Sequence, residues 1–160
     1  MKRVPTLFLK SVVVLLGIPA LALCIFVVPE IGNFMAELYP DHSYLRALVY
    51  VDLYASAIPF YIALYQAFNL LTYIDRNDAF SEQSVSALMK IKQCALAISA
   101  LYVLGLPLFY LLAERDDAPG IILIGLVLIF ASMVIAVFAA VLEKLLRQAI
   151  DIKSENDLTV

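Results

Sequence analysis

Asp52 is the strongest candidate for chemistry in this sequence, because it stands directly before the uncharged apolar run Leu53–Ile74. An acidic side chain inside a membrane segment is by default a candidate for binding a proton or a cation. The run that follows is long enough to cross a bilayer without Asp52. The sequence therefore leaves two interpretations open, an intramembrane acid or an acid at the outer membrane interface.

Four polar side chains of this segment make up a candidate intramembrane polar site: Asp52, Gln66, Tyr61 and Tyr65. At 100° per residue, Asp52 and Gln66 fall on the side of the helix that carries small residues such as Ala63, while the two tyrosines fall on another side. Because small residues let helices approach closely, we expect the Asp52 side to face other spans. The tyrosine side has three open interpretations, which are packing on another span, on a second copy, or on an apolar ligand.

The other reactive residue types are scarce. Two cysteines and one histidine are too few for a disulfide framework or a zinc site built by the protein. Cys24 and Cys94 are predicted near opposite faces of the bilayer and therefore remain free thiols. We expect no catalytic residue, no metal and no cofactor, and the net charge of −3 argues against direct binding of nucleic acid.

Long uncharged runs dominate the chain, and 64% of the residues are hydrophobic. Because about 20 apolar residues cross a bilayer as a helix, we predict an all-α membrane protein with four transmembrane helices in one domain. The predicted spans are residues 8–29, 47–73, 91–113 and 119–142.

Lysine and arginine predict the orientation, since basic residues are enriched in cytoplasmic loops. With both termini inside the cell, two basic residues, Arg46 and Arg115, lie outside. The outer loops are instead acidic, through Glu30, Glu37, Asp41, Glu114, Asp116 and Asp117. The basic residues that this orientation places inside are Lys2, Arg3, Lys10, Arg76, Lys90, Lys92, Lys144, Arg147 and Lys153.

The first apolar run also resembles a secretory signal peptide that ends near Ala22. We expect the run to be retained as a span, because it continues through Val28 without a polar start of a mature chain. Residues 31–38 predict a short amphipathic helix that ends before Pro40. It lies either on the outer membrane surface or against the bundle.

The polar loop 75–92 is expected in the cytoplasm, with Ser81 as the N-cap of a helix that runs from Glu82 into the third span. The fourth helix is predicted to continue past Leu142 as an amphipathic extension, and the chain then ends in a short polar tail within residues 143–160. We expect the apolar stripes of these two overhangs, for example Leu88 and Leu145, to cover each other. The polar residues left outside form a candidate cytoplasmic partner surface: Asp75, Arg76, Asp78, Glu82, Arg147 and Asp151.

Two stretches carry a family resemblance, FNLLTYIDRNDAFSEQSVSALMKIK in the loop region and EKLLRQAIDIKSENDLTV at the C-terminus. With the four-span pattern they resemble the YoaS-like family of bacterial membrane proteins, which carry a domain of unknown function. The resemblance implies a location in the bacterial cell (inner) membrane and no established enzyme activity or cofactor. Members are often encoded beside a small Cro/CI-type helix-turn-helix regulator, which implies a partner of that kind.

Two hypotheses about function follow. The first is a membrane protein without enzyme activity whose cytoplasmic elements bind or control a small DNA-binding regulator. The second is a small proton- or cation-coupled transporter that acts as a homodimer through Asp52. In both, the lipid bilayer is the main partner, and the sequence leaves the ligand, the protein partner and the oligomeric state open.

Overall fold

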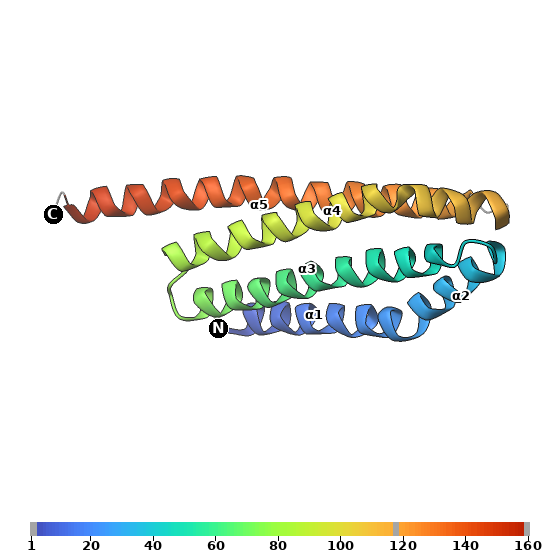
Figure 1. The fold of residues 1–160 in the computed structure, drawn as a ribbon. Coiled ribbons are helices and arrows are strands. Elements are labelled where there is room, and N and C mark those ends of the chain that lie inside the picture. Colours follow the sequence, from blue (N-terminus) through green and yellow to red (C-terminus); the bar gives the residue numbers. More distant parts are fainter. Residues whose placement is uncertain (1–2, 117–118, 159–160) are drawn as a thin grey trace.

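The computed structural model describes residues 3–116 and 119–158. Within those residues every regular element is helical (Figure 1). Lys2 and Asp117 lie outside the described residues, and the side chains of Arg3, Arg115 and Asp116 are likewise not described. The elements are α1 (Arg3–Ala22), a π-helical segment (Leu23–Val27), α2 (Val28–Leu38), α3 (Tyr44–Asp75), α4 (Glu82–Asp116) and α5 (Gly120–Leu158).

Four helical stretches are long and apolar enough to cross a membrane, and α1 with α2 makes up the first of them. The helices form an open row in which α1 lies beside α3, α3 beside α4, and α4 beside α5 (Figure 1). Across the described part of the chain, α1 makes no contact with α4 or α5. Each long helix therefore buries its contact faces against chain neighbours and leaves broad apolar surface for lipid.

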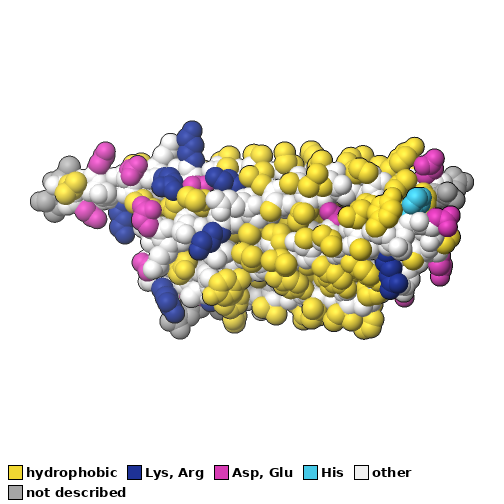
Figure 2. Space-filling model, in the orientation of Figure 1, with side chains coloured by type: hydrophobic (Ala, Val, Ile, Leu, Met, Phe, Trp, Pro, Cys, Tyr) yellow, Lys and Arg dark blue, Asp and Glu magenta, His cyan; other side chains and the backbone are white. Residues whose placement is uncertain are grey.

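On the face that Figure 2 shows, charged side chains gather toward the two ends of the molecule, and hydrophobic side chains cover much of the middle. Both termini lie at the same end (Figure 1). We call this end the inner end and the opposite end the outer end, after the orientation that the charges predict. This arrangement matches a multi-pass membrane protein, since lipid-facing surface must be apolar between two polar interfaces.

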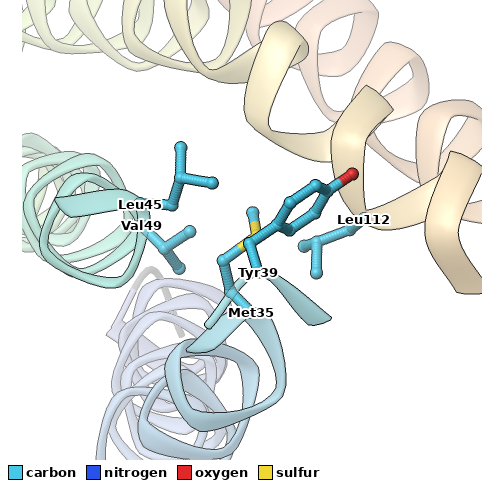
Figure 3. Packing of buried hydrophobic residues seen from close by; sticks show 5 residues of the cluster. All are labelled: Met35, Tyr39, Leu45, Val49 and Leu112. Carbon is cyan, nitrogen blue, oxygen red and sulfur yellow. The ribbon is translucent and has the colours of Figure 1, made fainter. Parts of the chain in front are cut away.

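A small core closes the outer end, where α2 packs on α3 and α4 (Figure 3). Met35 of α2 is fully buried, and the Tyr39 hydroxyl donates a hydrogen bond of 2.9 Å to the backbone carbonyl of Leu111. The short amphipathic helix therefore packs against the bundle, which was one of its two open interpretations. The cluster consists of Met35, Tyr39, Leu45, Val49 and Leu112.

Two predictions at helix ends can be checked directly. α4 begins at Glu82, and the Ser81 hydroxyl oxygen accepts a hydrogen bond of 3.3 Å from the backbone N–H of Ser84. This N-cap is confirmed, and it satisfies one of the four N–H groups that a helix start leaves free. The polar tail differs from its prediction, because α5 continues as a helix to Leu158.

The expected mutual cover of the two apolar overhangs holds only in part, since Leu146 and Ile150 of α5 are partly buried. Leu88 of α4 is buried, but Leu142 and Leu145 of α5 remain 51% and 56% exposed. The reason is an ion pair at this level, in which Lys92 of α4 lies 3.3 Å from the carboxylate of Glu143. Because Glu143 turns toward α4, Leu142 and Leu145 are rotated away from that helix.

Candidate functional site

Asp52 lies on α3 and points at Gly105 of α4. Its side chain is 9% exposed, and a Cβ atom built on Gly105 would lie 2.4 Å from the Asp52 Oδ2 atom. The carboxylate therefore fills the space that glycine leaves on α4. Among the described residues, Oδ2 has no hydrogen-bond partner. A buried polar atom without a partner is unusual in proteins and marks the position for attention.

The depth of Asp52 follows from two neighbouring helices. On α3, Arg46 comes six residues before Asp52, which is about 9 Å along the axis. On α4, Gly105 lies nine residues before Glu114, which is about 14 Å along the axis. Both helices place the carboxylate well below the outer charges, and this favours the intramembrane interpretation over the interfacial one.

Two hydroxyl groups complete the polar environment in the seam between α3 and α4. Ser56, one turn after Asp52, is 4% exposed and donates a hydrogen bond of 2.8 Å to the backbone carbonyl of Leu53. The Ser56 hydroxyl also lies 3.3 Å from the Tyr102 hydroxyl of α4. Asp52, Ser56, Tyr102 and Gly105 are from here on called the Asp52 cluster.

The other three residues of the candidate intramembrane site do not join this cluster. Gln66 lies fourteen residues after Asp52, about 21 Å along α3. The Tyr61 hydroxyl donates a hydrogen bond of 2.8 Å to the Gly17 carbonyl of α1, and Tyr65 is 64% exposed. The four residues thus lie at different heights and on different sides of α3. Of the four, Asp52 alone belongs to the Asp52 cluster.

Sequence reasoning missed three members of the cluster. Ser56 carried a usable signal, since it follows Asp52 by four residues and so shares its side of the helix. The sequence held no such signal for Tyr102 and Gly105, because the register between α3 and α4 decides which residues of α4 meet Asp52.

The tyrosine side of α3 packs on the first span. The Tyr54 hydroxyl donates a hydrogen bond of 2.9 Å to the Cys24 carbonyl, and Tyr61 reaches the Gly17 carbonyl. Of the three interpretations of this face, packing on another span therefore holds for Tyr54 and Tyr61. Both cysteines, Cys24 and Cys94, are free thiols as predicted.

At the inner end, Asp75 is already engaged within the chain. Its carboxylate lies 2.9 Å from the Lys10 ammonium and accepts a hydrogen bond from the Thr6 hydroxyl. These contacts join the start of α1 to the end of α3. Asp75 was expected to be part of the partner surface, and the structure assigns it to this internal contact instead.

The remaining residues of the partner surface are exposed: Arg76, Asp78, Glu82, Arg147 and Asp151. They come from the α3–α4 loop, the first turn of α4 and the far part of α5. Arg147 lies 3.4 Å from Glu143, so it is held in place by the same carboxylate that binds Lys92.

Comparisons with known proteins give two matches. A family model described as "Protein of unknown function (DUF2975)" matches residues 30–160. The chain is also 67% identical over 160 residues, the full length of both proteins, to the "Uncharacterized membrane protein YoaS" of Bacillus subtilis (strain 168). No solved structure matches the chain.

Proposed function

The chain belongs to the DUF2975 family, which confirms the YoaS-like resemblance, and from this premise we propose that it holds a small cytoplasmic helix-turn-helix regulator at the membrane. It is a multi-pass bacterial membrane protein, and the proposal adds a partner and a non-catalytic role. The candidate docking element is the part of α5 that follows the Lys92–Glu143 ion pair.

The single observation that supports this proposal most is the length of α5. The Lys92–Glu143 ion pair aligns α4 with α5 at the inner end. From this pair, α4 extends about 15 Å back to Glu82, whereas α5 extends about 22 Å on to Leu158. The last part of α5 therefore projects past the rest of the protein (Figure 1).

The part of α5 that follows the ion pair offers chemistry suited to a protein partner. Leu145 and Ile152 are 56% and 66% exposed and lie seven residues apart, on one side of the helix. They follow Glu143 and Lys144, so they lie outside the uncharged run of the span. Exposed apolar side chains at this spacing are typical of a helix that docks into a groove of a partner.

A binding measurement tests the proposal. The full-length protein in lipid nanodiscs is titrated with a purified Cro/CI-type regulator from the neighbourhood of its own gene. We expect Leu145→Glu with Ile152→Glu to weaken binding by about tenfold or more, which corresponds to ~1.4 kcal/mol. A matched double change at the outer end, Glu37→Lys with Asp41→Lys, should leave binding unchanged. Equal binding by both double variants would remove the docking role of α5.

A second candidate function is a proton- or cation-coupled transporter acting as a homodimer through Asp52. The observation that favours it is the buried Asp52 Oδ2 atom, which lacks a partner among the described residues. Flux of protons or Na⁺ into liposomes that contain the protein tests this function. Flux that Asp52→Asn abolishes would support the transporter, and an absence of flux in the unchanged protein would remove it.

A further inference from the structure

We propose that Asp52, Ser56 and Tyr102 form a binding site for one monovalent cation, with Na⁺ competing against a proton, in the seam between α3 and α4. The proposal is independent of regulator docking. It deepens the transporter candidate by naming a ligand, but it concerns binding alone and does not require transport.

The first step is charge balance. An ionised carboxylate in a low-dielectric environment is very unfavourable unless a positive charge compensates it. On α3 the closest basic residue in sequence is Arg46, whose guanidinium lies over the ring of Tyr50, 5.5 Å from its centre. On α4 it is Arg115, ten residues and about 15 Å along the axis beyond Gly105, whereas Lys92 lies thirteen residues before Gly105 and is paired with Glu143. Neither helix therefore supplies a positive charge at Asp52.

The other elements around the outer half of α3 do not supply one either. α2, which packs on α3 and α4, carries Glu30 and Glu37 and has no basic residue. On α1, Lys10 is paired with Asp75 at the inner end. The only ionisable side chain of a neighbouring helix in the Asp52 cluster is that of Tyr102, and a phenol hydroxyl cannot carry a compensating positive charge. The compensating charge must therefore be a proton or a bound cation.

The second step is the ligand set, which contains oxygen atoms only. The Ser56 hydroxyl follows Asp52 by one turn of α3 and lies 3.3 Å from the Tyr102 hydroxyl, and Tyr102 precedes Gly105 by three residues on α4, so the carboxylate and the two hydroxyls occupy adjacent turns of the seam. Pro59 has no N–H group, so the Ala55 carbonyl lacks the donor that an uninterrupted helix would provide four residues later. Oxygen ligands suit hard cations rather than soft transition metals.

Because the site contains a single carboxylate, it favours an ion with a single positive charge. A monovalent ion leaves the site neutral, whereas a divalent ion would leave a net positive charge in an apolar environment. Na⁺ binds as the proton on the Asp52 carboxyl group leaves for bulk water, so one proton is released for each ion bound.

Proton release tests the site. The full-length protein in nanodiscs, kept in weak buffer with a pH-sensitive dye, receives NaCl or the same concentration of choline chloride. We expect about one proton released per chain with NaCl, none with choline chloride, and none from Asp52→Asn with either salt. Asp41→Asn, a change at an exposed acid of the outer loop, should behave as the unchanged protein.

Two further variants test whether the site binds an ion or whether Asp52 only takes up and releases a proton. Ser56→Ala and Tyr102→Phe should raise the Na⁺ concentration for half release several-fold while the total number of protons released stays the same. If Asp52→Asn does not yield a folded protein, as judged by circular dichroism and size-exclusion chromatography, these two variants carry the test. Unchanged half-release concentrations in both would overturn the assignment of the ligands.

Four other results bear on the proposal. No proton release from the unchanged protein with NaCl, or equal release from a folded Asp52→Asn variant, would overturn the site. A larger release with KCl than with NaCl would overturn the choice of ion. Release without any flux in liposomes would support the site and remove the transporter, so the two proposals fail separately.

Discussion

The hydroxyl of Tyr54 on α3 donates a hydrogen bond of 2.9 Å to the backbone carbonyl of Cys24 in the π-helical segment. In that segment the N–H of Val28 bonds to the carbonyl of Leu23, five residues earlier. A bond of the same spacing would join Pro29 to Cys24, but proline has no N–H group. Tyr54 thus donates the hydrogen bond that Pro29 cannot donate, and it holds the π-helical segment against α3.

Tyr54→Phe should destabilise the protein by ~1 kcal/mol, because the Cys24 carbonyl loses its donor in an apolar environment while the ring packing stays. Unfolding in detergent, followed by circular dichroism, measures this change. In a Pro29→Ala background the backbone regains an N–H group, so the same Tyr54→Phe change should cost less than ~0.5 kcal/mol. An equal cost in both backgrounds would show that the hydroxyl acts elsewhere.

Gly105→Ala should destabilise the protein by ~1–3 kcal/mol, since the new methyl group would overlap the Asp52 carboxylate and force α3 and α4 apart. Labelling of the buried Cys94 by a thiol-reactive dye measures this loss of stability, in a variant that also carries Cys24→Ser. The labelling rate is followed as the protein is heated. Gly120→Ala is the matched control, because no atom outside the local backbone lies within 4 Å of its new Cβ. Asp52→Ala should relieve the cost of Gly105→Ala, and a cost that persists in the double variant would contradict the contact.

Asp75→Asn should destabilise the inner end by ~1–3 kcal/mol, because the partly buried Lys10 ammonium loses its counter-charge. Asp78→Asn removes an exposed carboxylate from the same loop region and should change stability by less than ~0.5 kcal/mol. Chemical unfolding of the two variants side by side gives the comparison. Similar values for both would mean that the Lys10–Asp75 contact contributes little.

Ser81→Ala should cost ~0.5–2 kcal/mol by removing the acceptor for the Ser84 N–H group at the start of α4. Hydrogen exchange in the first turn of α4 is the sharper measurement, because the loss of an N-cap frays the adjacent amides first. Ser81→Asp restores an acceptor and should return exchange to the original rate. Fast exchange with aspartate at this position would argue against the capping role.

The sequence by itself determined the class of fold and one helix boundary, the start of α4. Long uncharged runs predict the four spans, because lipid forces a chain to satisfy its backbone within helices. Local chemistry also predicts the capped start of α4 at Ser81, since the acceptor and the N–H group are three residues apart. Within α3, the period of the helix alone places Asp52 on the side that faces another span.

The tertiary structure decided which residues meet between helices. Gly105 and Tyr102 face Asp52, and Asp75 reaches Lys10, only because α4 and α1 stop at particular rotations and heights against α3. The exposure of Leu145 has the same origin, since the Lys92–Glu143 ion pair turns α5 away from the packing that apolar periodicity favoured. Periodicity in one helix carries no information about its register with the next, because that register is set by contacts between side chains far apart in the sequence.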